Sequence, residues 1–172
     1  MSERFDFNKF GRRSLSIVVH SKGKNFARLA EEIESLRQEH QGIRNKTVKA
    51  FIDCNLGRRL LIAAIDNSEP VALVDRLYKI CVQKGFNTLH SEVYAAIEYA
   101  YYCGARACHT KGLLALRQIK NKISASEGMS GRSKQIFLEA LEEPIRRLNS
   151  RLSSTHDVAG FRRRKRDENE AD

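Results

Sequence analysis

Apolar residues spaced three and four apart recur along most of this chain, and this helical periodicity constrains the fold more than any other feature. The first series begins at Phe26 and the last ends at Leu152. Gly42 and the small-residue stretch SASEGMSG (residues 124–131) separate such series as turn signals. Proline, which breaks helices, occurs only twice. We therefore predict an all-α fold, a helical bundle of five to seven helices.

The segment Arg13–His20 (RSLSIVVH) departs from this pattern. Leu15, Ile17 and Val19 alternate with the remaining side chains, which is the period-two spacing of a β-strand. The sequence thus predicts one short N-terminal β-strand. A lone strand leaves its edge unpaired, so we expect a partner strand, such as the same strand of a second subunit.

This strand, a helix over Lys24–His40, a turn at Gly42 and a helix from Asn45 follow one another in an order that is similar to a ribbon–helix–helix DNA-binding unit. In that family the strand pairs antiparallel across a dimer and reads the major groove. The resemblance implies a dimeric DNA-binding regulator. It is limited to the N-terminal part of the chain, and Ser14 and Ser16 stand where groove reading prefers long polar side chains.

Composition along the chain predicts three segments with disordered ends. Residues 1–23 form an N-terminal arm and strand, residues 24–153 a helical domain, and residues 154–172 a disordered tail in which a basic run precedes an acidic one. No stretch approaches the ~20 apolar residues of a membrane span, and the start lacks a secretory signal. We expect a cytoplasmic protein without a membrane partner, or a nuclear one if Arg162–Arg166 serves as an import signal.

The charge balance favours a polyanionic partner. The chain carries a net charge of +10, and residues 101–153 alone hold ten Lys and Arg against four Asp and Glu. Such an excess attracts phosphates, so the sequence predicts binding to RNA or DNA through lysines and arginines of the C-terminal helices. The candidate nucleic-acid-binding residues are Arg12, Arg13, Lys22, Lys24, Arg58, Arg59, Lys111, Arg117, Lys120, Lys122, Arg132, Lys134, Arg146, Arg147 and Arg151.

Catalytic signatures are missing from the sequence. It contains no P-loop, no dinucleotide-binding glycine pattern, no H-E-x-x-H and no G-x-S-x-G. We predict a non-enzymatic protein without a cofactor, namely an oligomeric ribonucleoprotein or nucleoprotein subunit. Two alternatives stay open: a protein-interaction adaptor or scaffold whose charge is incidental, and a small enzyme whose site is assembled from unrecognised parts.

Two cysteines and a histidine, Cys103, Cys108 and His109, raise the question of a zinc site. Zinc needs converging ligands, but on a continuous helix five residues rotate by about 500°, which leaves the two sulfurs about 140° apart. They converge only if Gly104 ends the helix. We therefore expect buried thiols and no metal.

The helix expected over residues 89–108 carries small residues on one stripe, including Ala96, Ala100 and Gly104, which lets another helix approach closely. Tyrosines occupy its other faces, and tyrosine is enriched at interfaces. We predict a homo-oligomer, or a subunit of a larger complex, with Tyr94, Tyr101 and Tyr102 at the oligomer interface.

Overall fold

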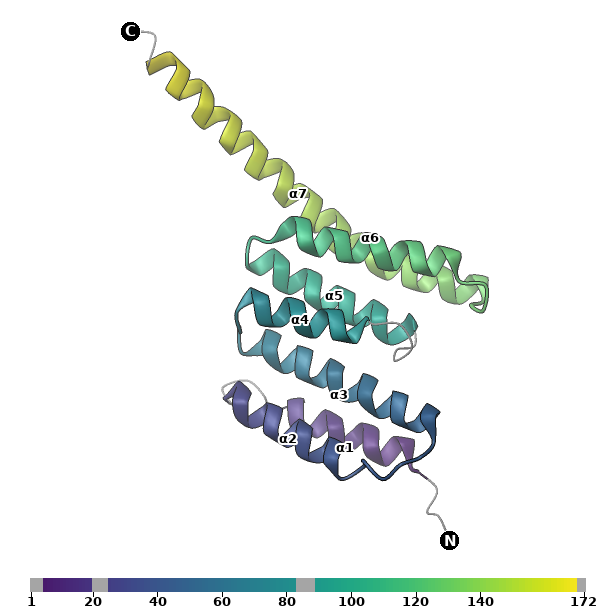
Figure 1. Cartoon of the computed structure of the whole chain (residues 1–172). Helices are drawn as coiled ribbons and strands as arrows, with labels where there is room; N and C mark the ends of the chain where they lie inside the picture. Colours follow the sequence, from purple (N-terminus) through teal and green to yellow (C-terminus); the bar gives the residue numbers. More distant parts are fainter. Residues whose placement is uncertain (1–4, 20–24, 83–88, 170–172) are drawn as a thin grey trace. The chain divides into compact units, whose positions relative to one another are not determined.

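A computed structural model describes residues 5–19, 25–82 and 89–169, with side chains as far as residue 153. Within these ranges the chain forms seven α-helices and no strand, which confirms the predicted all-α class. The chain divides into two compact units, Met1–Tyr99 and Ala100–Asp172, whose boundary falls within α5. The helices are α1 (Phe7–Val19), α2 (Phe26–Gln38), α3 (Lys46–Asp66), α4 (Val71–Cys81), α5 (Leu89–Ala105), α6 (His109–Ala125) and α7 (Gly131–Asn169) (Figure 1).

The predicted N-terminal strand is wrong, because residues 13–19 belong to helix α1; His20 lies outside the described residues. The Asp6 carboxylate starts this helix by accepting hydrogen bonds from the backbone N–H groups of Asn8 and Lys9, each at 2.9 Å. These are donors that a helix start leaves without intrahelical partners. The resemblance to a ribbon–helix–helix unit therefore lacks its ribbon.

Burial along α1 follows the helical period and not the strand period. Phe10, Ser14 and Val18 are buried at four-residue intervals, whereas Leu15 and Val19 are 42% and 60% exposed. The Ser14 hydroxyl donates to the carbonyl of Gly11 at 3.0 Å, so this polar side chain is satisfied inside the core. Ser14 is thus a polar residue on the buried face of the helix, and its position there makes the sequence look like an alternating strand.

In the first unit, α1 and α2 pack side by side against α3 (Figure 1). Phe10 of α1, Ile33 and Leu36 of α2, and Ile52 and Leu56 of α3 belong to one buried core cluster. The three helices bury their apolar stripes against one another, as the spacing of those residues predicts.

Helix α4 also packs against α3. Helix α3 runs unbroken through Gly57, where the sequence had allowed a break. A methyl group added at Gly57 would lie 3.8 Å from the Cys81 sulfur of α4, so the position faces this contact. On α5, the Tyr99 ring stacks on Tyr78 with centroids 4.2 Å apart, and its hydroxyl donates to Asp75 at 2.6 Å.

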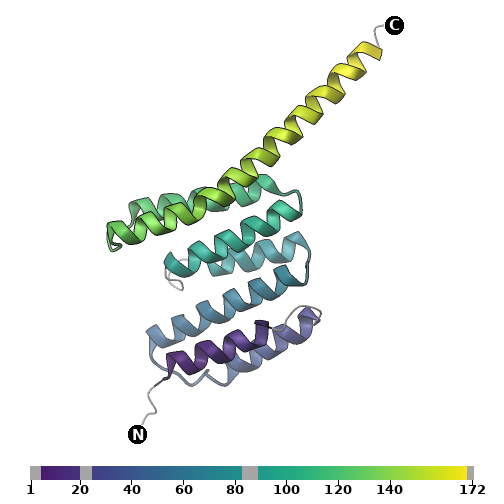
Figure 2. The same ribbon diagram turned by 180° about the vertical axis from the view of Figure 1, so that it is seen from behind.

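In the second unit, α6 and α7 form an antiparallel hairpin, which Figure 2 shows from behind. Leu113, Leu116 and Ile123 of α6 and Leu141 and Leu148 of α7 are buried between them and the end of α5. Among the described residues, no helix is long and apolar enough to span a membrane.

Helix α7 is continuous through Pro144 and extends to Asn169. Its backbone is helical as far as Asn169, and the disorder predicted for residues 154–172 stays a prediction. Residues 161–169 are rich in Arg and Lys, which are good helix formers. The side chains of Arg162–Arg166 lie outside the described residues.

Candidate nucleic-acid interface

The end of α5 turns the chain sharply into α6. Ala107 adopts a left-handed backbone with φ 57°, and the Cys108 N–H donates to the Cys103 carbonyl at 2.8 Å. This six-residue closure around a left-handed residue is the Schellman arrangement, which usually places glycine where Ala107 stands. The turn lets α6 begin at His109, four residues after α5 ends.

The cysteines near this turn differ in exposure. Cys103 is completely buried and Cys108 is partly exposed at the start of α6. Among the residues that the structure describes, no group of three His, Cys, Asp or Glu side chains is placed to hold a metal ion. Cys54 and Cys81 of the first unit are buried too, and burial raises the pKa of Cys81 to about 12. The expectation of buried thiols is therefore confirmed for three of the four cysteines.

The stripe of small residues on α5 is a place of close helix approach, as predicted. A methyl group added at Gly112 of α6 would lie 3.0 Å from the Cys103 Cβ and 3.2 Å from the Ala100 Cα. One added at Gly104 would lie 3.3 Å from the Leu148 Cδ2 of α7. Only glycine lets the backbones come this near, so these positions set the distance between the three helices of the second unit.

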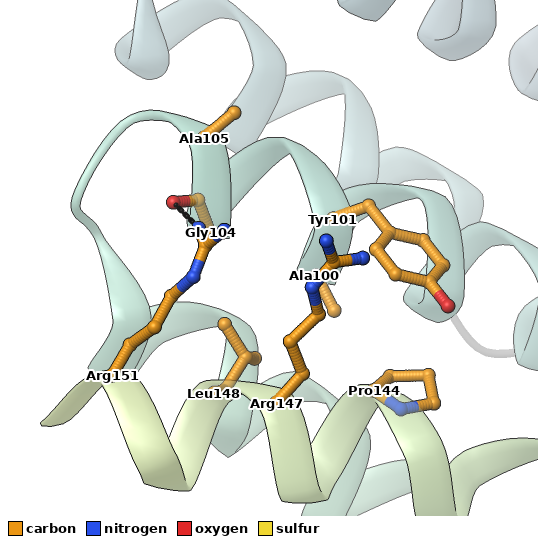
Figure 3. Close-up of a pocket in the computed structure, with 8 residues that line it drawn as sticks. All are labelled: Ala100, Tyr101, Gly104, Ala105, Pro144, Arg147, Leu148 and Arg151. Atoms are coloured by element: carbon orange, nitrogen blue, oxygen red, sulfur yellow. Dashed lines mark hydrogen bonds between the residues drawn. The ribbon is translucent and has the colours of Figure 1, made fainter. Parts of the chain in front are cut away.

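Beside this contact the second unit has a pocket of about 160 Å³ between the end of α5 and the middle of α7 (Figure 3). Small and apolar side chains line its interior, while two arginines and a tyrosine supply its polar groups. The lining residues are Ala100, Tyr101, Gly104, Ala105, Pro144, Arg147, Leu148 and Arg151.

Arg147 and Arg151, the two arginines of the pocket, make different contacts. The Arg151 Nη1 donates to the Gly104 carbonyl at 2.6 Å, so this side chain caps a backbone acceptor at the end of α5 (Figure 3). The Arg147 guanidinium lies 6.0 Å from the centroid of the Tyr101 ring and makes no ion pair with any described residue. Tyr101 is 42% exposed. Arg147 and Tyr101 therefore offer a cation and a ring face to an incoming ligand.

Charge is segregated along the second unit. No Asp or Glu occurs in residues 100–122 or 144–153, and the four acidic residues up to residue 153 lie between Glu127 and Glu143. Gly112 packs on Leu148, so the acid-free start of α6 and the acid-free part of α7 lie at the same end of the hairpin. We call this region the basic end; its cations are Arg106, Lys111, Arg146, Arg147 and Arg151.

Within the basic end, most cations remain exposed to solvent. Arg146 is 78% exposed and pairs with Glu143, which lies one helical turn earlier. The Arg106 guanidinium lies 5.7 Å from the Tyr102 ring centroid. Exposed pairs of this kind contribute little to stability, so they compete weakly with an external anion.

The remaining predicted cations are dispersed. Lys120 and Lys122, with Arg117, are exposed further along α6, and Arg132 and Lys134 lie at the start of α7, at the opposite end of the hairpin from Arg147. Lys22 and Lys24 lie outside the described residues.

In the first unit, several arginines that we predicted to bind nucleic acid already contact other side chains or are half-buried. Arg13 makes a two-pronged contact with Glu39 at 2.5 and 2.7 Å, and this hydrogen bonding lowers the pKa of Glu39. Arg58 and Arg59 are half-buried on α3; Arg58 lies 5.1 Å from the Tyr94 ring centroid, and burial lowers the pKa of Arg59. The structure thus does not gather all fifteen predicted residues at one site.

The three tyrosines predicted at an oligomer interface are not equivalent. Tyr94 and Tyr101 are 40% and 42% exposed, whereas Tyr102 is buried with 5% exposed. Tyr102 thus offers little surface to a second copy.

Sequence analysis treated the small residues of α5 as a packing stripe and so missed them, and Pro144, as pocket walls. The spacing of Ala100, Gly104 and Pro144 carries no sign of a pocket, since only the crossing of α5 and α7 creates it. No protein-family model, curated protein or solved structure matches this chain.

Proposed function

We propose that this protein is a non-enzymatic nucleic-acid-binding protein that contacts phosphate backbones through the basic end of its second unit. The observation that carries the proposal is a group of exposed cations on that unit. Cations from the end of α5, the start of α6 and the middle of α7 meet at one end of the hairpin, where residues 100–122 and 144–153 hold no acidic residue and Glu143 pairs with Arg146.

The physical argument rests on local potential. Scattered surface charges are neutralised by acidic neighbours, whereas cations that share one end of a hairpin without acids raise the potential together and attract a polyanion. Arg147 has no carboxylate partner among the described residues, and an arginine in that state suits the two-pronged geometry of a phosphate. Lys111 adds an exposed cation at the start of α6.

Assembly into oligomers or larger complexes is part of the proposal. Leu15 and Val19 lie one helical turn apart on α1 and are both exposed, and Tyr94 exposes much of its ring on α5. Apolar and aromatic side chains of this kind are enriched at interfaces. Light scattering of the purified protein tests this part, and a strictly monomeric protein over all concentrations would contradict it.

The main experiment measures the binding of labelled single-stranded RNA, single-stranded DNA and duplex DNA by fluorescence anisotropy at low salt. The double variant Arg146→Glu/Arg147→Glu places repulsion at the basic end, and we expect it to weaken binding at least about tenfold. Arg151 is left unchanged because it also caps α5.

The matched control is Arg44→Glu/Arg76→Glu. Both arginines are exposed in the first unit, and both double variants reduce the net charge by the same amount. We expect the control to bind nearly as tightly as the wild type. Equal losses in the two variants would show that total charge, and not the basic end, carries the interaction.

A further inference from the structure

The pocket next to the basic end combines an aromatic wall with a cation. Tyr101 presents a ring that is 42% exposed, and Arg147 lies at 6.0 Å from its centroid on the neighbouring helix (Figure 3). Ala100, Gly104 and Pro144 also line the pocket and add a surface without long side chains. A flat, neutral ring attached to a phosphate matches these features, because the ring stacks on the tyrosine while the guanidinium meets the phosphate.

We propose that this pocket is a base-stacking subsite, and that the protein therefore prefers single-stranded over duplex nucleic acid. The inference rests on the proposed function, since it specifies which nucleic acid the basic end takes. In a duplex the faces of each base are covered by its neighbours, so an aromatic wall can stack only on a base that is unpaired or extruded.

The size of the pocket supports a single base as its occupant. Pockets that enclose a whole small-molecule ligand are typically about 300–1,000 Å³, whereas this one is about 160 Å³. A space of this size takes one ring system and leaves the rest of the ligand outside. A strand meets this condition because its other nucleotides continue over the surface, where Arg106 and Lys111 supply further cations.

The helix packing keeps the subsite in place. Arg151 ties α7 to the end of α5 through the Gly104 carbonyl, and Leu148 contacts both Gly104 and Gly112. Tyr101 and Arg147 are thus carried by two helices that are held together independently of any ligand. A site formed in advance loses less free energy on ordering when it binds.

The test compares binding of a single-stranded oligonucleotide and of its duplex by the full-length protein and its variants. We expect Tyr101→Ala to weaken binding of the single strand by about 5- to 20-fold and binding of the duplex by less than about twofold. Tyr101→Phe keeps the ring and should bind like the wild type. Tyr101→Leu keeps apolar bulk without a flat ring and should lose as much as Tyr101→Ala.

The matched control is Tyr94→Ala. Tyr94 has the same exposure as Tyr101 to within a few per cent and also lies beside an arginine, but it belongs to the first unit and does not line the pocket. It should leave the preference for single strands unchanged. Circular dichroism of each variant verifies that the helices are intact.

A further arm uses adenosine monophosphate as competitor, and we expect it to displace the oligonucleotide only in large excess, because the mononucleotide lacks the phosphate contacts outside the pocket. Displacement by an equimolar amount of the mononucleotide would overturn the strand as the ligand. Equal affinity of the wild type for single strand and duplex, or an unchanged single-strand affinity of Tyr101→Leu, would overturn the inference while leaving the proposed function intact. If the wild type binds neither nucleic acid, both fail.

Discussion

Ala107 occupies a backbone conformation that favours glycine. Its φ of 57° lies in the left-handed region, which costs an L-residue about 1–2 kcal/mol, and part of this cost is offset by the lower entropy of alanine in the unfolded chain. We expect Ala107→Gly to raise the free energy of unfolding by about 0.5–1 kcal/mol in urea titrations.

The control for this change is Ala140→Gly, on an exposed part of α7 inside the helix. There glycine should lower the free energy of unfolding by about 1 kcal/mol. If both substitutions destabilise the protein, the left-handed conformation of Ala107 is refuted.

The buried thiols should differ from Cys108 in reactivity. The pKa of Cys81 is raised from 9.0 to about 12 because burial disfavours the thiolate. Iodoacetamide at pH 9, followed by mass spectrometry, should label partly exposed Cys108 and leave Cys81 unmodified. In urea all four cysteines should react, and rapid labelling of Cys81 in the folded protein would contradict its burial.

The raised pKa of Cys81 also makes the free energy of unfolding depend on pH. The unfolded chain releases the Cys81 proton near pH 9, whereas the folded chain keeps it until about pH 12. Between these values the unfolded state is favoured progressively as the pH rises, by at most about 1.4 kcal/mol per pH unit. The contribution of this group to stability is thus fully present below pH 9 and is lost above it.

Among the elements, α1 differs most from the sequence-based expectation. The strand prediction rested on the alternation over residues 14–19 and did not consider Asp6 as a helix start. We expect Asp6→Ala to lower the free energy of unfolding by about 1 kcal/mol and to reduce helical circular dichroism, because two backbone N–H groups lose their acceptor.

Asp6→Ser keeps a capping oxygen and should retain most of the stability. An unchanged free energy of unfolding in Asp6→Ala would mean that residues 7–19 are not held as a helix by this cap.

The packing of α6 against α5 and α7 depends on Gly112. A methyl group there would lie 3.0 Å from atoms of Cys103 and Leu148, so Gly112→Ala should lower the free energy of unfolding by about 1–2 kcal/mol, despite the higher helix propensity of alanine. Gly11 of α1 has no neighbouring atom within 4 Å of an added methyl group, so Gly11→Ala should instead stabilise the protein by about 0.5–1 kcal/mol. Denaturant unfolding of both variants checks the pair, and a stabilising Gly112→Ala would contradict the close packing.

At the scale of the whole molecule, the sequence predicted the helical class and the starts of α2, α3 and α5 to within a few residues, but it missed α1. Periodicity reports the buried face of each helix, which is a local property. The pocket could not be predicted in this way, because it depends on how α5 and α7 cross. The burial of Cys103, in contrast, was expected, because free cysteine is among the most buried residue types.

The clustering of charge shows where sequence reasoning came nearest to the candidate site. The excess over residues 101–153 was visible in the sequence, but fifteen cations were treated alike. In the hairpin, Arg146, Arg147 and Arg151 of α7 lie at the same end as Lys111 of α6, whereas Arg132 and Lys134 lie at the other end. The positions of these cations in the hairpin therefore narrow our candidate nucleic-acid-binding residues to the few that lie in the basic end.

The salt dependence of binding to a single-stranded oligonucleotide tests the central claim most directly. The logarithm of the association constant should fall linearly with the logarithm of salt concentration, by about 0.7 for each phosphate contacted. We expect Arg146→Glu/Arg147→Glu to reduce the steepness of this line by about 1.4, and Arg44→Glu/Arg76→Glu to leave it unchanged. A slope near zero for the wild type, or the same slope in all three proteins, would contradict phosphate contact at the basic end.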